Sequence, residues 1–167
     1  MIRDHFRVLK VDLSTGKGRI EEIDGRNTCA GGSGLSALLF GQMGFPDRTW
    51  EDPEQPLIFA IGPLTGYFPL MSKVVCAFKS PYHDQFAESH GGGRSALSLR
   101  FADLDALVIT GKARRPSCLV VGCASSSARR CWLRDAGCSG NRAAAGKSLP
   151  ASRPAVSACA GRGGPSG

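Results

Sequence analysis

The sequence predicts an α+β fold in which two similar strand–helix–strand units form mainly antiparallel sheets, followed by a disordered tail. Three observations lead to this prediction. Short apolar segments alternate with turns rich in glycine and proline, as is typical of strands joined by tight connections. Two glycine-rich turns run into the same tripeptide, Ser-Ala-Leu, at residues 36–38 and 95–97, which indicates a duplication, although two short matches can also arise by chance. Beyond residue 121 the apolar pattern ends.

The first unit is expected to begin with a β-hairpin. Residues 5–13 alternate so that Phe6 and Val8 face one side of a strand and Leu9 and Val11 the other, because successive side chains point to opposite faces. A turn-forming sequence follows, which lets the chain return. The further expected elements are strands at 19–23, 57–61, 74–78, 107–110 and 117–121, helices after Gly34 and Gly93, a loop at 47–56 and a polar connection at 82–88.

The net charge of +7 is distributed unevenly. Residues 1–121 hold 14 Lys and Arg against 13 Asp and Glu, whereas residues 122–167 hold seven against one. A basic chain often binds nucleic acid or an anionic membrane, but here the body is nearly neutral. We therefore expect neither as a partner, and a nucleic-acid binder driven by the tail ranks third among the hypotheses. No secretory segment follows Met1 and no apolar run reaches about 18 residues, so the predicted location is the cytoplasm.

The change at residue 121 predicts two regions, a folded domain at 1–121 and a low-complexity tail at 122–167. The tail contains no Ile, Phe, Tyr or Met, so it cannot bury enough apolar surface to offset its ordering entropy. Four of the seven cysteines lie in it, at spacings that match no common zinc or cluster motif. We predict that the tail is disordered and hypothesise that it is an out-of-frame translation.

A glycine turn and a nearby lysine are the candidate binding residues of the folded domain. Successive backbone N–H groups in Gly91-Gly92-Gly93 can form a concave site for an anion, and a helix after them adds its dipole. Lys73, at the start of the 74–78 strand, and His90 could contact the same ligand. Each has a simpler interpretation: a tight turn packed on its own domain, a solvated lysine and a surface histidine.

A second glycine motif offers an alternative function. Residues 32–37 satisfy the G-x-G-x-x-A pattern of dinucleotide-binding turns, with acidic residues at 51 and 52. That pattern requires an apolar strand directly before it, and residues 25–30 do not form one. The alternative is a dinucleotide-binding module that uses Gly32, Gly34 and Ala37.

Taken in order, these segments resemble the N-terminal domain of the aldehyde ferredoxin oxidoreductase family of tungsten or molybdenum enzymes. The resemblance spans roughly residues 6–121 and depends on the order and spacing of its parts. The segments that carry it are 11–16, 34–35, 62–66, 79–81, 91–93 and the stretch from 101 to 113, with 133–136 as a further short match.

The resemblance implies a domain that forms the base of a site for a tungsten (or molybdenum) bis-pyranopterin cofactor. Lys73 stands where the family has an arginine that contacts the pterin or its phosphate, and His90, Gly91 and Gly92 stand in an Asn-Ser/Ala-Gly segment. Lysine keeps the positive charge but lacks the bidentate fork of arginine, and His90 replaces an amide.

The resemblance also implies a larger enzyme, which oxidises an aldehyde and passes electrons through a 4Fe-4S cluster to ferredoxin. The cluster ligands and the acid/base residues of the family lie in later domains. No catalytic or metal-ligating residue is therefore expected in this chain, which is expected to be inactive alone. Self-association as a homo-oligomer is left open.

Overall fold

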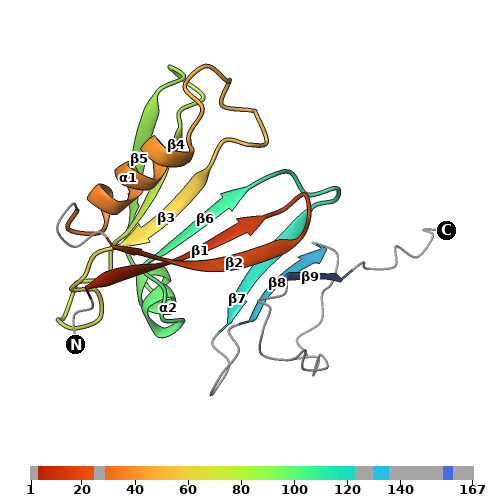
Figure 1. Cartoon of the computed structure of the whole chain (residues 1–167). Helices are drawn as coiled ribbons and strands as arrows, with labels where there is room; N and C mark the ends of the chain where they lie inside the picture. Colours follow the sequence, from red (N-terminus) through yellow and green to blue (C-terminus); the bar gives the residue numbers. More distant parts are fainter. Residues whose placement is uncertain (1–3, 25–28, 123–129, 136–155, 160–167) are drawn as a thin grey trace.

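The computed structural model describes residues 4–24, 29–122, 130–135 and 156–159. These residues form strands and two helices (Figure 1). The strands are β1 (His5–Asp12), β2 (Lys17–Asp24), β3 (Leu57–Ile61), β4 (Val74–Lys79), β5 (Phe86–Gly91), β6 (Ala106–Thr110), β7 (Ser117–Gly122), β8 (Arg130–Asp135) and β9 (Val156–Cys159), and the helices are α1 (Ser33–Met43) and α2 (Ser95–Phe101).

Strands β1 to β6 form one six-stranded sheet in the order β2-β1-β6-β3-β4-β5. Every neighbouring pair in this sheet is antiparallel except β1 and β6, which are parallel. Strands β7, β8 and β9 form a second sheet, and Leu119 and Val121 of β7 pack against the core of the first. The predicted α+β class with mainly antiparallel sheets is confirmed.

The two helices cover opposite faces of the six-stranded sheet. On one face, Leu39 of α1 packs in a cluster with Phe6 and Val8 of β1. On the other face, Leu9 of β1 belongs to a cluster that Leu99 of α2 covers. The prediction that β1 is apolar on both sides is confirmed. Burial of one such side chain contributes about 1.5–3 kcal/mol to the free energy of folding. Because β1 supplies buried side chains to both clusters, it stabilises both cores.

Along the chain, one order of elements occurs twice, first as β1-β2-α1-β3 and then as β4-β5-α2-β6. The two Ser-Ala-Leu tripeptides, at 36–38 and 95–97, lie in α1 and α2. The predicted strand–helix–strand units are present as β2-α1-β3 and β5-α2-β6. Their origin by duplication stays a prediction, because β6 pairs parallel to β1 whereas β3 pairs antiparallel to β4.

The prediction of a polar connection over 82–88 is wrong from Phe86 onward, because strand β5 begins there and pairs with β4 along its whole length. Strand β5 lies at the edge of the six-stranded sheet, and its sequence contains few strand-forming residues. Pairing with a buried neighbour can override a weak intrinsic propensity. His90 and Gly91 therefore belong to a strand and not to the entry of a helix.

The region at 122–167, for which the composition predicts disorder, contains strands β8 and β9. Strand β8 pairs antiparallel with β7, and β9 pairs parallel with β8. The local sequence of β8, Arg-Cys-Trp-Leu-Arg-Asp, is more apolar than the average of the region. The other residues beyond Gly122 lie outside the described part of the chain, so the disorder, the out-of-frame origin and the domain boundary at 121 stay predictions.

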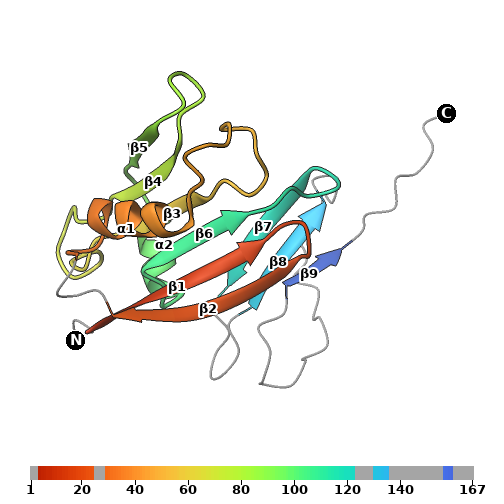
Figure 2. The same cartoon turned by 45° about the horizontal axis from the view of Figure 1, so that its top comes forward.

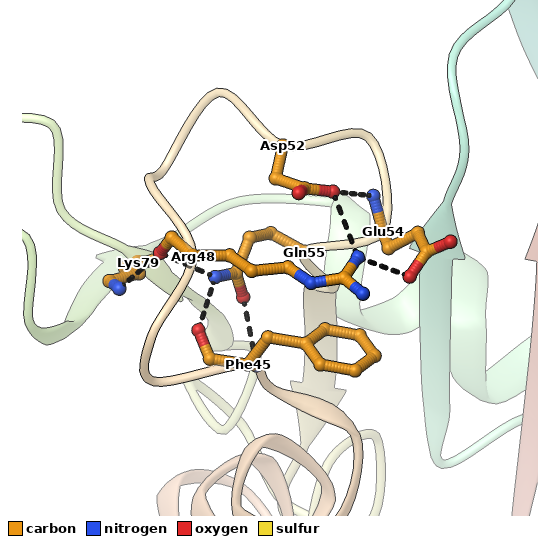
Figure 3. Close-up of polar contacts among 6 residues, drawn as sticks. All are labelled: Phe45, Arg48, Asp52, Glu54, Gln55 and Lys79. Atoms are coloured by element: carbon orange, nitrogen blue, oxygen red, sulfur yellow. Dashed lines mark hydrogen bonds and ion pairs between the residues drawn. The ribbon is translucent and has the colours of Figure 1, made fainter.

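The loop between α1 and β3, residues 44–56, is held in place by two buried side chains (Figure 3). Lys79 of β4 donates from Nζ to the carbonyl of Pro46 at 2.7 Å and to that of Arg48. Gln55 donates from Nε2 to the carbonyls of Phe45 at 2.6 Å and Arg48 at 3.1 Å. The loop has little regular structure, so these side chains satisfy backbone carbonyls that would otherwise need water.

Candidate functional site

Five glycines meet at one end of the six-stranded sheet, which we call the glycine end (Gly31, Gly32, Gly62, Gly91 and Gly92). The Gly32 N–H donates to the carbonyl of Ile61, the last residue of β3, at 3.0 Å. Ile61 pairs with Val74 of β4, and Val74 pairs with Gly91 of β5. The start of α1 and the 62–72 loop lie at this same end in both views (Figures 1 and 2).

These glycines do not all serve the fold. Gly31 has a φ of +87°, and a Cβ there would lie 3.0 Å from Pro63 Cδ, so the backbone requires glycine. Gly92 differs, because a Cβ there would meet nothing within 4 Å and its φ lies outside the left-handed region. A Cβ on Gly91 would make an ordinary contact of 3.4 Å with Val74. Neither packing nor backbone conformation explains glycine at 91 and 92.

The structure brings together the four residues that the sequence singled out. Lys73 directly precedes β4, whose first residue pairs with Gly91, and the next residue of β4 pairs with His90. Lys73 is exposed, and it forms no ion pair with any residue that the structure describes. An unpaired cation therefore lies beside an open glycine segment, an arrangement that suits an anionic ligand.

The turn after β5 adds a second cation that the sequence reasoning missed. Gly93 has a φ of +100°, and exposed Arg94 follows it as the N-cap residue of α2. Helix α2 has only seven residues, so its dipole adds less than the prediction assumed. The positive charges of Lys73 and Arg94, together with the backbone of Gly92, remain as the features that could attract an anion.

His90 is tied to helix α1 through a carboxylate. Its Nε2 lies 3.3 Å from Oε2 of Glu88 on the same strand, and the buried Ser36 hydroxyl of α1 donates to the other oxygen of Glu88 at 3.2 Å. These contacts orient the imidazole. They also place a negative charge near the glycine end, so His90 is less suited than Lys73 to contact an anion.

Arg100 of α2 shapes the neighbouring 62–66 turn, and the sequence reasoning did not single it out. Its guanidinium donates to the carbonyls of Gly62, Pro63 and Thr65, each at 3.1 Å, and to Asp105 Oδ1 at 3.1 Å. A turn with several inward carbonyls needs donors, but the direction of those carbonyls is visible only in the structure, so no local sequence signal identified the arginine. The turn is consequently held from inside the domain.

The dinucleotide-binding alternative lacks the required architecture. Gly32 does precede a helix, as N-cap of α1, but the strand before it, β2, ends at Asp24. In the dinucleotide-binding fold the strand, glycine turn and helix are consecutive and the next strand is a parallel neighbour. Here β2 lies beside β1 at the edge of the six-stranded sheet, and β1 and β6 separate it from β3.

A hollow of about 760 Å³ lies at the opposite end of the sheet and contains charged side chains. Arg48 in its wall pairs with Glu54 and lies over the Phe45 ring, 4.2 Å from the centroid (Figure 3). Asp12 accepts hydrogen bonds from the Thr15 hydroxyl and a backbone N–H, which lower the pKa of its carboxyl. The arginine is thus paired within the wall, and the Asp12 carboxylate is already held by hydrogen bonds from its own turn, so the hollow presents no unpaired cation among its described lining residues.

No metal site is assembled in the described part of the chain, and the Cys76 thiol is not activated. Within those residues, no group of three or more His, Cys, Asp or Glu could hold a metal ion. Burial raises the pKa of the Cys76 thiol, which disfavours the reactive thiolate. Neither described helix is long and apolar enough to cross a bilayer.

Known proteins match most of this chain. The family described as "Aldehyde ferredoxin oxidoreductase, N-terminal domain" matches residues 8–164. A tungsten-containing aldehyde ferredoxin oxidoreductase of Pyrococcus furiosus is 35% identical over 113 residues, which are 66% of this chain and 19% of that protein. An aliphatic sulfonate oxidoreductase, WOR-like subunit, of the same organism is 33% identical over 69% of this chain and 19% of its own length. The chain thus spans about a fifth of these relatives.

A solved structure shares the fold. A chain of the active-site complex BamBC of benzoyl coenzyme A reductase, in complex with 1,5-dienoyl-CoA, superimposes with a TM-score of 0.63 and 27% identity. The superposition covers 78% of this chain and 19% of that one. The family match extends over far more than half of the sequence. The chain belongs to the aldehyde ferredoxin oxidoreductase family, in which it corresponds to the N-terminal domain.

Proposed function

We propose that this domain forms the base of a tungsten (or molybdenum) bis-pyranopterin site in an oxidoreductase. The observation that carries the proposal is the pair of glycines at 91 and 92, which neither packing nor φ requires. Glycine at the end of a strand without a structural reason is typical of positions where a ligand approaches the backbone closely. Lys73, exposed beside this segment, supplies a positive charge.

The residues present fit the phosphate part of such a cofactor. Backbone N–H groups of Gly92 and Gly93 and the ammonium of Lys73 are donors that suit phosphate oxygens, and Arg94 offers a guanidinium next to them. His90 would help to hold the group, with its ring oriented by Glu88, whose Oε2 lies 3.3 Å from its Nε2. When bound, the cofactor supplies the two-electron redox chemistry, while these residues bind and orient it.

The proposal extends to a larger enzyme of the family. Tungsten and ferredoxin are named for the curated relatives, and we propose the same class of reaction here: oxidation of an aldehyde or oxo group, with electrons passing through a 4Fe-4S cluster to an iron–sulfur protein. The residues of this domain would take no part in that chemistry beyond holding the cofactor. A cytoplasmic location is part of the same proposal.

The test is metal retention by the full chain, expressed in a host that makes the pterin cofactor and purified for elemental analysis of tungsten and molybdenum. We expect bound metal in the wild-type chain and loss of metal in Gly92→Val. In Lys73→Gln we expect the cofactor to bind roughly 10- to 100-fold more weakly, since a hydrogen bond from a charged group contributes about 1.5–3 kcal/mol. Lys112→Gln, at an exposed lysine outside the glycine end, is the matched control. Metal-free wild-type protein, or equal retention by all variants, would contradict the proposal.

A further inference from the structure

Gly62, the first residue after β3, is a further glycine of the glycine end that the fold does not require. Its φ lies outside the left-handed region, and beyond the adjacent residues the nearest atom to an added Cβ would be Thr65 Oγ1, at 4.0 Å. That is an ordinary contact, so a side chain as small as alanine would fit there. The space over Gly62 is open, as it is at Gly92, and the Thr65 hydroxyl faces it.

Thr65 is a buried residue whose hydroxyl has no partner in the described part of the chain. The residue is only 4% exposed. Its N–H donates to the Gly62 carbonyl at 3.1 Å, and its carbonyl accepts a hydrogen bond from Arg100 Nε at 3.1 Å. The hydroxyl, in contrast, forms no hydrogen bond with any residue that the structure describes. Buried polar groups are almost always hydrogen-bonded, because leaving one without a partner costs free energy, so this hydroxyl points to a ligand.

Arg100 holds the turn so that the hydroxyl keeps this direction. Its guanidinium donates to the carbonyls of Gly62, Pro63 and Thr65, and it is itself fixed by the buried carboxylate of Asp105, 3.1 Å from Nη1. These backbone acceptors of the turn are thereby used from inside the domain, and the Thr65 hydroxyl is left on the side of Gly62. A donor that is held in place in advance loses little conformational entropy when it binds.

The open space over Gly62 lies beside the positive charge of the glycine end. The last paired row of residues at this end runs across β3, β4 and β5. The next residues outward on these three segments are Gly62, Lys73 and Gly92, so the exposed lysine follows β4 between two open glycines. A cation with open backbone on both sides suits a tetrahedral anion, whose oxygens accept hydrogen bonds from several directions. An oxygen of that anion over Gly62 meets the Thr65 hydroxyl.

We propose that Thr65 is a further binding residue of the glycine end, and that its hydroxyl donates a hydrogen bond to a phosphate oxygen lying over Gly62. This assignment rests on the proposed function for the source of the phosphate, which is then the phosphate group of the pterin cofactor. Inorganic phosphate offers the same chemistry, so the experiment has to separate the two sources.

Thr65→Val tests the hydroxyl, because valine has nearly the same shape. In the full chain expressed without the cofactor, the thermal midpoint of unfolding is expected to stay the same or to rise, since no hydrogen bond within the described chain is lost. In the full chain expressed with the cofactor, Thr65→Val is expected to hold metal roughly tenfold more weakly, as for loss of a hydrogen bond to a charged group. Thr65→Ser restores the hydroxyl and should retain metal like the wild type. Thr49→Val, at an exposed threonine of the 44–56 loop, is the matched control.

Titration of the cofactor-free chain with inorganic phosphate, followed through the amide resonances of Gly62 and Gly92, identifies the source of the phosphate. Shifts that weaken in Thr65→Val show that phosphate alone occupies the site. Metal retention that depends on Thr65, without such shifts, identifies the cofactor as the source.

Two outcomes would overturn the role of Thr65 directly. One is equal metal retention by Thr65→Val and the wild type. The other is a lower unfolding midpoint in Thr65→Val than in Thr49→Val, because the hydroxyl would then serve the fold. Metal-free wild-type protein contradicts the proposed function instead. In that case the phosphate titration decides: shifts that depend on Thr65 retain it as a phosphate-binding residue, and their absence excludes it.

Discussion

Replacing Lys79 by methionine keeps the aliphatic stem of a buried side chain and removes the ammonium that fixes the 44–56 loop. In the native chain Nζ donates to the carbonyls of Pro46 and Arg48 and lies 3.4 Å from Oδ2 of Asp84. In the variant the Arg48 carbonyl keeps one donor, Nε2 of Gln55, at 3.1 Å. The bond to the Pro46 carbonyl, at 2.7 Å, is lost in the variant.

The size of the effect follows from these contacts. A hydrogen bond from a charged group contributes about 1.5–3 kcal/mol, and the Asp84 pair, whose carboxylate is about half exposed, adds at most about 1 kcal/mol. Methionine no longer carries the desolvation cost of a buried ammonium, which offsets part of the loss. We expect Lys79→Met to lower the free energy of unfolding by about 2 kcal/mol.

Urea unfolding followed by far-ultraviolet circular dichroism measures this difference. Lys112→Met is the control, because the side chain of Lys112 is exposed and surface substitutions usually change stability by less than about 0.5 kcal/mol. Hydrogen exchange gives a local readout, since the Trp50 N–H donates to Asp84 at 3.1 Å and should exchange faster once the loop opens. If both lysine variants lose the same stability and Trp50 keeps its protection, the assignment of Lys79 as the loop's anchor is wrong.

Two further predictions test other parts of the fold. Gly111→Ala should lower the free energy of unfolding by about 2 kcal/mol or more, because φ at Gly111 is +79° and the added Cβ would lie 2.3 Å from Asp12 Oδ1. In Gly92→Ala the added Cβ meets nothing within 4 Å, so the free energy of unfolding should change by less than about 1 kcal/mol. Equal thermal midpoints for the two variants would contradict this reading. The Thr15 hydrogen bond lowers the pKa of Asp12 in the folded chain, so its stabilisation is present above the unfolded pKa, near 4, and is lost as the pH falls through the folded value. In Asp12→Asn the free energy of unfolding should therefore decrease less as the pH is lowered from about 5 to 2. An unchanged pH dependence in this range would exclude Asp12 as a contributor.

Local patterns in the sequence were sufficient to predict most strands. Alternation along β1 identified both of its buried faces, because a strand has a side-chain period of two wherever it lies in a sheet. Strand β3, Leu57–Ile61, was predicted with its observed bounds, since an apolar run stopped by glycine and proline is a strong local signal. Strand β5 was missed because its stability comes from pairing with β4, which is not a local property.

The candidate site depended on the family resemblance more than on local chemistry. Lys73 and Gly91 lie beside each other only because β4 and β5 pair with Val74 opposite Gly91, and that register is not visible in either segment alone. Arg100 could not be assigned in advance, since its partners at 62–65 lie in a different loop. The glycines showed the reverse case: only the structure could separate Gly31, which the fold requires, from Gly92, which it does not.

The place of β6 in the sheet has a consequence for how the chain folds. This strand, the last of the six in sequence, lies between β1 and β3 and pairs residues such as Val8 and Ala106 that are far apart in the chain. Before residue 110 is available, β2-β1 and β3-β4-β5 are two separate pieces with no shared strand. Non-local pairing of this kind slows folding, and during synthesis the two pieces must wait for β6. A ribosome that stalls before this point would leave two exposed sheet edges side by side, each a template for aggregation.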